Sequence, residues 1–256
     1  MAKLNFFCKV VIDVFVTFVC WVYYTFGFII IFAPAYTFCT LFKQNKELSY
    51  QRLNYHFYRT FFLLLEFITP GLRISFQGGL ENIKSSIIVS NHLSYLDPLL
   101  LISIYKRHKT IVKDKFFNIP IFGSVLKRSG YIPSTSKGKL AYLTIHQMEQ
   151  LKDFFSAGGN LFIFPEGTRF SHNKHSSFYQ GAFKIAKRYN VPIRVISIQN
   201  TDLFFPPGKL LFNTGAVDSI TVVMLGTIYP DLSGKDTSVS ELMEQAQHIL
   251  NSREDT

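Results

Sequence analysis

The sequence predicts an α/β fold: a mixed, largely parallel sheet flanked by helices, with a hydrophobic membrane helix or helical hairpin at the N-terminus. Two observations lead to this prediction. Beyond residue 70, short apolar runs alternate with segments of helical periodicity, which is the pattern of an α/β sheet. Before that point, residues 14–42 contain no charged side chain. We therefore divide the 256 residues into a membrane-associated helical segment, 1–60, and an α/β domain, 61–256.

The uncharged run at 14–42 is long enough to cross a bilayer core, which takes about 20 apolar residues in a helix. It could also enter the bilayer and return as a hairpin, with Gly27 or Pro34 at the bend. A cleaved signal peptide is a third reading, but the apolar stretch is too long and Pro34 fits a cleavage site poorly. Because Lys3 and Lys9 precede the run and basic residues also follow it, a hairpin with both ends in the cytoplasm is favoured over a single span.

A polar, basic stretch follows the run and leads into the apolar segment 61–65, so we expect an amphipathic connection that lies against the membrane or the domain. Its basic residues are Lys43, Lys46, Arg52 and Arg59. Positive residues beside a membrane segment tend to stay cytoplasmic, which places the α/β domain on the cytoplasmic face. The formal net charge of +10 indicates an anionic partner, and the anionic membrane surface fits best. Nucleic acid is disfavoured, because neither zinc-finger spacing nor an RNA-binding aromatic signature occurs.

Six segments of the domain are predicted as strands, because each is short and apolar and is bounded by glycine, proline or polar residues. In chain order they are 73–76, 86–90, 110–112, 161–164, 192–198 and 221–228. Gly71 and Gly78 bound the first, Gly159 precedes the fourth, and the fifth opens at Pro192. Strands that are separated by helical segments favour parallel pairing.

Four segments have helical features, namely 98–105, 139–155, 180–189 and the stretch from about residue 239. The first follows Asp97 and opens with Pro98, which suit an N-cap and the first helical position. The second repeats apolar residues at helical spacing and ends at a glycine pair. The last has a capping box, because Ser238 and Glu241 lie three positions apart.

Polar residues directly follow two of the predicted strands, at the strand ends where ligands bind in sheets of this class. After the strand at 86–90, His92 lies five positions before Asp97. A lone histidine is usually structural, and a cap alone would explain Asp97. A carboxylate within hydrogen-bond reach, however, fixes the tautomer of an imidazole and stabilises it after it takes a proton. His92 and Asp97 are therefore candidate catalytic residues.

After the strand at 161–164 come Glu166, Gly167, Thr168 and Arg169. As an ordinary turn, this segment would simply pair Arg169 with Glu166. A guanidinium fork also suits a phosphate monoester. Gly167 would let backbone N–H groups approach an oxygen closely. The four residues are therefore candidates for binding an anionic substrate.

Together, the two segments resemble the glycerolipid acyltransferases, specifically the 1-acylglycerol-3-phosphate O-acyltransferases. Those sequences carry a His-x4-Asp block and a Phe-Pro-Glu-Gly-Thr-Arg block, which stand here at 92–97 and 164–169 in the family's order. Between them the family has a Lys, a Pro-x-x-Gly and a strand-opening Gly, matched here by Lys113, Pro120, Gly123 and Gly130. The family's fourth block is matched by Val-Pro-Ile at 191–193, so the resemblance covers roughly residues 72–201.

The resemblance implies transfer of a fatty acyl group from a thioester, acyl-CoA or acyl carrier protein, to the sn-2 hydroxyl of lysophosphatidic acid, giving phosphatidic acid at the membrane. It implies His92 as general base, Asp97 as its orienting carboxylate, and Arg169 with Lys113 as phosphate ligands. Backbone N–H groups around Gly167 are candidates for the oxyanion position. Apart from the thioester co-substrate, no cofactor and no metal is implied.

Two positions depart from the family pattern. Lys115 stands where the family usually has an acid, and Ser136 stands where it usually has an arginine that is thought to help hold the acceptor's phosphate. Lys137 and Lys139 lie close enough in the sequence to replace that arginine. Ser136 therefore keeps open a different acceptor, either another lysophospholipid or an amino-acid-linked lipid.

Two functions from other classes remain as alternatives. A lipid hydrolase is disfavoured, because no Gly-x-Ser-x-Gly elbow occurs and the three cysteines all lie at or before residue 39. A membrane-bound lipid-binding protein without activity is disfavoured, because both His92 and Asp97 are present.

Overall fold

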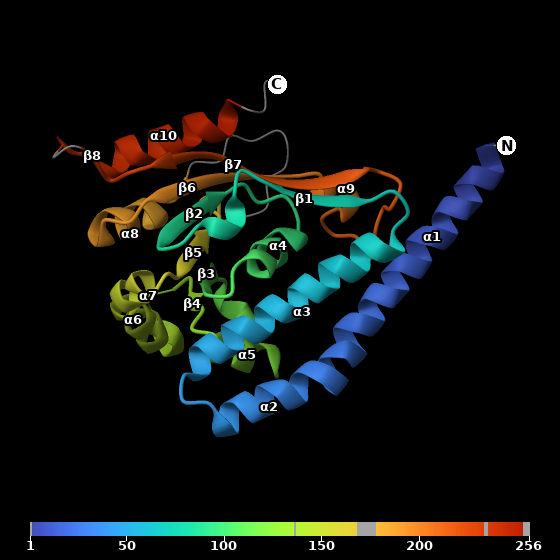
Figure 1. The fold of residues 1–256 in the computed structure, drawn as a ribbon, viewed down its shortest axis with the longest axis horizontal. Helices are drawn as coiled ribbons and strands as arrows, with labels where there is room; N and C mark the ends of the chain where they lie inside the picture. Colours follow the sequence, from blue (N-terminus) through green and yellow to red (C-terminus); the bar gives the residue numbers. More distant parts are fainter. Residues whose placement is uncertain (1, 136, 168–177, 233–234, 253–256) are drawn as a thin grey trace.

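The computed structural model describes residues 2–135, 137–167, 178–232 and 235–252. It contains a seven-stranded sheet with helices on both faces, and a long N-terminal helix runs along one side of the molecule (Figure 1). The predicted fold class is therefore confirmed.

The strand order in the sheet is β1-β7-β6-β2-β5-β3-β4, and every pair is parallel except β6 with β7. The strands are β1 Arg73–Gln77, β2 Ser86–Ser90, β3 His108–Val112, β4 Ile132–Pro133, β5 Asn160–Ile163, β6 Ile193–Gln199 and β7 Ser219–Ile228, with a separate pair β8 Asp231–Leu232 and β9 Lys235–Asp236. All six predicted strands occur, and β4 is too short to have been predicted. The central β2 is buried on both faces, with Ile88 in one apolar core and Ile87 and Val89 in the other.

The α-helices are α1 Ala2–Val22, α2 Ala33–Phe42, α3 Lys46–Ile68, α4 Leu96–Ile104, α5 Phe122–Arg128, α6 Ala141–Glu149, α7 Leu151–Ser156, α8 Gly181–Tyr189, α9 Thr201–Phe204 and α10 Val239–Asn251. The 3-10 turns are η2 Leu80–Asn82, η3 Asp114–Asn118 and η4 Gly138–Leu140. The segment at 139–155, predicted as one helix, is divided into η4, α6 and α7. The predicted capping box is present, with Ser238 and Glu241 each accepting the other's backbone N–H.

The predicted cap of α4 is wrong. The helix begins at Leu96 after Tyr95, so Asp97 and Pro98 stand inside the first turn instead of at the N-cap and first positions. Asp97 turns its carboxylate back toward the loop that precedes the helix, where it accepts the backbone N–H of Ser94 at 2.7 Å. It therefore organises the loop and not the helix end.

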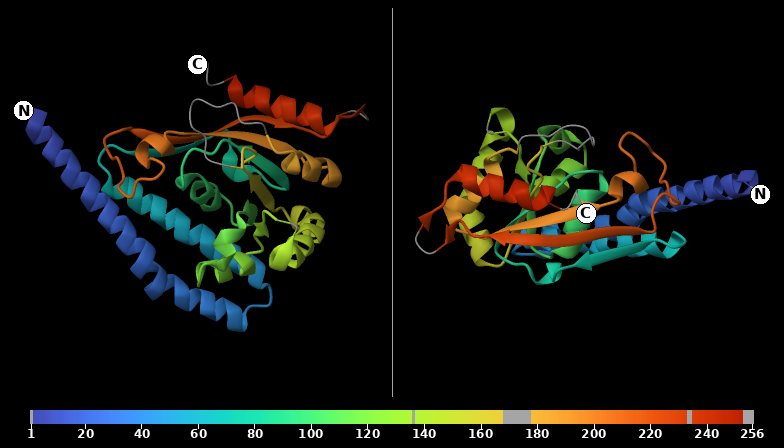
Figure 2. Two further views of the ribbon diagram at one scale, coloured as in Figure 1. Left: turned by 180° about the vertical axis from the view of Figure 1, so that it is seen from behind. Right: turned by 90° about the horizontal axis from the view of Figure 1, so that it is seen from above.

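The apolar N-terminal segment is one continuous helix, so the hairpin expected at Gly27 or Pro34 is wrong. α1 passes through the π-helical segment η1, Tyr23–Phe32, into α2. A π-helical turn and a first-turn proline can both be accommodated in a continuing helix. Phe7–Phe42 is by length and composition able to cross a membrane, although core helices and signal sequences also pass this test. The chain reverses only after Phe42, and α3 returns beside it (Figures 1 and 2).

α3 joins the N-terminal helix to the sheet domain. The ring of Phe57 lies 5.2 Å from that of Tyr23 and 4.8 Å from that of Phe32, centroid to centroid. Asn54 contacts both sides, since its Oδ1 accepts from Tyr36 Oη at 2.5 Å and its Nδ2 donates to Ser129 Oγ at 2.9 Å. The other face of the N-terminal helix exposes large apolar side chains, among them Phe7, Val11, Phe15, Phe18, Trp21, Phe26, Ile30, Phe38, Leu41 and Phe42.

The N-terminal part of α1 is fastened to the domain by a polar cluster that we call the clasp. It comprises Lys9, Asp13, Thr17, Phe212, Asn213 and Thr214. Asp13 Oδ1 accepts both the backbone N–H and the hydroxyl of Thr214, at 2.8 and 2.6 Å. Lys9 Nζ bridges Asp13 Oδ2 at 2.8 Å and Asn213 Oδ1 at 2.7 Å. The long helix is therefore held against the domain near both of its ends.

Candidate active site

The carboxyl ends of four neighbouring strands form one edge of the sheet, because β3, β5, β2 and β6 all run in parallel. His92 comes after β2, the segment 164–167 after β5, Lys113 after β3 and Thr201 after β6. Ligands bind at such an edge in open α/β sheets. The fold thus brings the two sequence blocks together, as the strand prediction required.

His92 and Asp97 form a hydrogen-bonded pair at this edge. His92 Nδ1 lies 2.9 Å from Asp97 Oδ2, the Asp97 side chain is fully buried, and that of His92 is 18% exposed. The partially exposed imidazole can reach a substrate, whereas the carboxylate is shielded from one. Such a pair can act as a general base with its orienting carboxylate.

The partners of Asp97 determine which imidazole nitrogen is basic. Its Oδ2 also accepts the backbone N–H groups of Leu93 at 2.5 Å and Ser94 at 2.7 Å, and its Oδ1 accepts from Thr201 Oγ1 at 2.5 Å. Since these groups are all donors, the carboxylate acts as an acceptor toward His92 as well. In the neutral imidazole this places the proton on Nδ1 and leaves the lone pair on Nε2.

Two contacts hold the His92 loop in place against the sheet. The ring of His92 stacks on that of Phe164, with centroids 4.4 Å apart and planes inclined by 25°. The side chain of Asn91 makes two bonds to the backbone of Ile198 on β6, both at 2.8 Å. The first contact ties the loop to the block that follows β5, and the second ties it to β6.

Gly167 has a conformational reason to be glycine. Its φ is +66°, and a Cβ at this position would lie 2.7 Å from Cε2 of Tyr179. Its own N–H donates to the carbonyl of Phe164 at 3.1 Å. That N–H is engaged within the turn, and the backbone N–H groups around Gly167 stay candidates for the oxyanion position.

Of the predicted residues around Gly167, Glu166 lies in the turn after β5. It follows Pro165 and is 9% exposed. Thr168 and Arg169 lie outside the described residues, and so does Ser136. The alternative in which Arg169 pairs with Glu166 therefore lies outside them as well.

Lys113 is an exposed residue between β3 and η3. Beside it, Asp114 Oδ1 accepts from Ser134 Oγ and from the Thr135 backbone N–H, both at 3.2 Å. These bonds join the segment after β3 to the segment after β4, which leads to Lys137. The basic residues of both segments therefore lie along the same edge of the sheet. Within the described residues, no cluster of three or more His, Cys, Asp or Glu side chains is placed to hold a metal ion.

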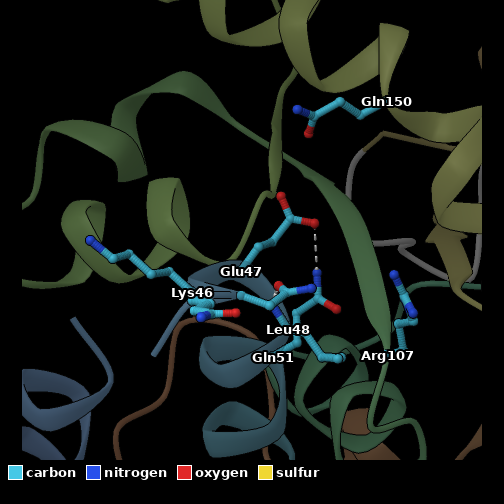
Figure 3. Close-up of a pocket in the computed structure, with 8 residues that line it drawn as sticks. Lys46, Glu47, Leu48, Gln51, Arg107 and Gln150 are labelled. Carbon is cyan, nitrogen blue, oxygen red and sulfur yellow. Dashed lines mark hydrogen bonds between the residues drawn. The ribbon is translucent and has the colours of Figure 1, made fainter. Parts of the chain in front are cut away.

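The structure also has a polar cavity of about 500 Å³ (Figure 3). Its lining residues are Gln44, Asn45, Lys46, Glu47, Leu48, Gln51, Arg107 and Gln150. Arg107 immediately precedes β3, which places the cavity at the amino end of a strand whose carboxyl end leads to Lys113. The cavity is therefore separate from the His92 site.

An ion pair between a buried lysine and a half-buried glutamate borders this cavity. Lys109 on β3 is 1% exposed, and its Nζ lies 3.0 Å from Glu47 Oε1 of α3 and 2.6 Å from Gln147 Oε1. Burial lowers the pKa of Lys109, an effect that the Glu47 carboxylate opposes. A Cβ on Gly130 would lie 2.3 Å from Glu47 Oε2. Gly130 thus makes room for the carboxylate that ties α3 to the sheet.

Comparison with known proteins agrees with this geometry. The family model Acyltransferase matches residues 73–199. The chain is 32% identical over 164 residues to the chloroplastic 1-acyl-sn-glycerol-3-phosphate acyltransferase LPAT1 of Arabidopsis thaliana, covering 62% of this chain and 45% of that protein. It is 30% identical over 118 residues to the lyso-ornithine lipid O-acyltransferase of Brucella abortus, covering 45% of this chain and 42% of that protein. The chain spans less than half the length of both curated relatives.

The fold is also found in a crystal structure. The 1-acyl-sn-glycerophosphate acyltransferase PlsC from Thermotoga maritima superimposes with a TM-score of 0.70 at 20% sequence identity, covering 98% of this chain and 95% of that one. At this identity the likeness establishes a shared fold.

Proposed function

Because the chain belongs to the acyltransferase family, we propose that it transfers a fatty acyl group from a thioester to the sn-2 hydroxyl of lysophosphatidic acid, giving phosphatidic acid. The main observation is the 2.9 Å contact between His92 Nδ1 and Asp97 Oδ2 at the carboxyl edge of the sheet. The name of the Arabidopsis relative supports the choice of acceptor.

In the proposed reaction, His92 Nε2 takes the proton of the acceptor hydroxyl while that oxygen attacks the thioester carbonyl carbon. Asp97 keeps the ring in the required tautomer and stabilises the imidazolium. When the tetrahedral intermediate collapses, the C–S bond breaks and the imidazolium returns the proton to the leaving thiolate. The acceptor is itself the nucleophile, so no acyl-enzyme forms.

The phosphate of the acceptor would be held by basic residues at the same edge. Arg169 is the last residue of the block at 164–169 that follows β5, and a guanidinium fork matches a phosphate in two bonds. Lys113 follows β3, the strand next to β5, and provides a second positive charge. Glu166 and Thr168 complete the proposed acceptor site. The acyl donor is a thioester of either CoA or acyl carrier protein, which present the same carbonyl group.

We also propose that the exposed apolar face of the N-terminal helix rests in the membrane and that the domain faces the cytoplasm. The basic residues after Phe42 support that orientation. Protein that stays with the membrane pellet after a high-salt wash agrees with insertion, and release by salt contradicts it. Impermeant labelling of single cysteines near residues 3 and 45 in intact cells tests the orientation. Labelling at residue 45 contradicts it.

A second acceptor has specific support. The Brucella relative is named for a lyso-ornithine lipid, and Ser136 replaces an arginine that the family usually offers to the acceptor's phosphate. An acceptor that carries an amino acid in place of a phosphate would not need that arginine.

One assay separates these functions. Purified full-length protein is offered lysophosphatidic acid, lysophospholipids with head groups and lyso-ornithine lipid. Each acceptor is tested with labelled acyl-CoA and with acyl-loaded carrier protein, and the products are identified by mass spectrometry. Phosphatidic acid as the main product supports the proposal. Preference for lyso-ornithine lipid selects the second acceptor. Free fatty acid without acylated lipid indicates a hydrolase, and turnover of no substrate rejects the enzymatic proposal.

A further inference from the structure

The carboxylate of Asp97 has a partner that neither sequence block contains. Thr201 Oγ1 donates to Asp97 Oδ1 at 2.5 Å, and both side chains are fully buried. The two residues are 104 positions apart in the chain. Thr201 is the first residue of α9, two positions after the last residue of β6. It thus reaches the oxygen that His92 does not touch.

The position of Thr201 is fixed by the segment 200–214, which we call the strap. Asn200 adopts a left-handed conformation, with φ of 68°, and turns the chain from β6 into α9. At the other end of α9, Ser94 Oγ of the His92 loop donates to the carbonyl of Phe205 at 2.9 Å. Further along, the ring of Phe212 packs on that of Phe205, with centroids 4.7 Å apart. The strap is therefore bound to the His92 loop at Phe205, and its own Phe212 ring packs on that residue.

The strap is also held from outside the site. The backbone N–H of Phe212 donates to Thr17 Oγ1 on α1 at 3.0 Å, which is part of the clasp. Asn213 N–H donates to the carbonyl of Phe204 at 2.8 Å, so the clasp end is tied directly to α9. These contacts fix the backbone that carries Thr201. Its hydroxyl therefore binds Asp97 with little further loss of conformational freedom.

We propose that Thr201 is a positioning residue for the proposed acyl transfer. Its hydroxyl fixes Oδ1, which stops the carboxylate from rotating and keeps Oδ2 directed at His92 Nδ1. The contribution rests on the proposed function, since it acts through the His92–Asp97 pair and touches no substrate. Small misplacements of a catalytic group lower turnover by up to about 100-fold. Loss of the hydroxyl is therefore expected to lower kcat while leaving KM for both substrates nearly unchanged.

The test compares Thr201→Ala with Thr201→Ser, two variants that differ by a single oxygen at this position. Thr201→Ala is expected to lose roughly 10-fold to 100-fold in kcat, and Thr201→Ser to stay within about threefold of wild type. Thr221→Ala is the matched control, because Thr221 is also a buried hydroxyl, hydrogen-bonded to Ser75 on β1, and lies on β7 away from Asp97. It should keep wild-type turnover. Circular dichroism and thermal melts establish that each variant is folded.

A double variant shows whether Thr201 works through the dyad. In a His92→Ala background the base is gone, so Thr201→Ala should cause no further loss of the residual rate. Wild-type kcat in folded Thr201→Ala, equal losses in the Ser and Ala variants, or the same loss in both backgrounds would each overturn the inference. If His92→Ala itself keeps wild-type activity, the proposed mechanism fails, which is a separate result from failure at Thr201 alone.

Discussion

The imidazole of His92 lies stacked on the ring of Phe164, with centroids 4.4 Å apart. One residue follows β2 and the other follows β5, so the contact joins the two sequence blocks that the parallel pairing of these strands brings side by side. The stack covers one face of the imidazole, and the bond from Nδ1 to Asp97 restrains its rotation. Nε2 is thereby presented in one orientation before any substrate arrives.

Replacing His92 by alanine tests the proposed general base. General-base catalysis contributes about 10²–10⁴-fold, so His92→Ala should lower kcat by that factor and leave folding and membrane association intact. His56→Ala is a matched control, because His56 is an exposed histidine on α3. Steady-state kinetics on both variants provides the measurement. A His92→Ala enzyme that keeps more than about a tenth of wild-type kcat rules out the base role.

Arg169→Ala should chiefly harm binding of a phosphate-bearing acceptor. Hydrogen bonds to charged groups contribute about 1.5–3 kcal/mol, so KM for lysophosphatidic acid should rise roughly 10-fold or more, with a smaller change for the acyl donor. Arg188→Ala, at the exposed end of α8, serves as control. Equal losses for both substrates, or a collapsed fold, would favour an ion pair between Arg169 and Glu166.

Gly167→Ala should destabilise the turn after β5. A non-glycine residue in the left-handed region costs about 1–2 kcal/mol, and the new Cβ would lie 2.7 Å from the Tyr179 ring. Gly181→Ala is the control, since no atom lies within 4 Å of the Cβ that would be added there. Denaturant unfolding of both variants measures the difference in free energy. Equal stability of the two would show that the turn tolerates a side chain.

His108 should make folding stability fall with acidity. It is fully buried, its Nδ1 lies 2.6 Å from the Tyr105 carbonyl and its Nε2 lies 2.7 Å from Tyr131 Oη. Burial lowers its pKa from 6.5 to about 4, an effect that the Tyr105 carbonyl partly opposes. Between these values the unfolded chain binds more protons than the folded one. The free energy of unfolding therefore decreases as pH falls through this window, by up to about 1.4 kcal/mol per pH unit, and this contribution is constant above it.

Unfolding measured at about pH 5 and about pH 7.5 checks this dependence, with His108→Gln as the comparison. The variant should lose overall stability but show a smaller difference between the two pH values. An unchanged difference would assign the acid sensitivity to other groups.

The sequence predicted those parts of the site that depend on local pattern. His92, Asp97 and the turn at Glu166 and Gly167 follow buried strands, and strand ends can be located from apolar runs bounded by polar residues. The partnership between Thr201 and Asp97 could not be predicted in this way, because it depends on how the strap packs over the loop. Its available signal was weak: Thr201 lies three positions beyond a predicted strand, at the same edge of the sheet.

The errors at the N-terminus have a different cause. Gly27 and Pro34 are residues that often end helices, but a helix continues through them when a π-helical turn precedes the proline. The capping role expected of Asp97 failed for a similar reason: α4 begins at Leu96, and the Asp97 carboxylate is engaged by the preceding loop and by Thr201. In both places a correct local preference was overruled by the surrounding structure.

The clasp and the contact between Tyr36 and Asn54 hold the long apolar helix near its two ends. Two separated attachments fix the orientation of the helix relative to the domain. A domain on a flexible tether swings above the bilayer and must find its lipid in three dimensions. With the helix embedded along its apolar face, this domain would keep one attitude toward the membrane plane. The search for a lipid substrate would then reduce to lateral diffusion in two dimensions. Each lipid would reach the carboxyl edge of the sheet, where His92 lies, from the same direction.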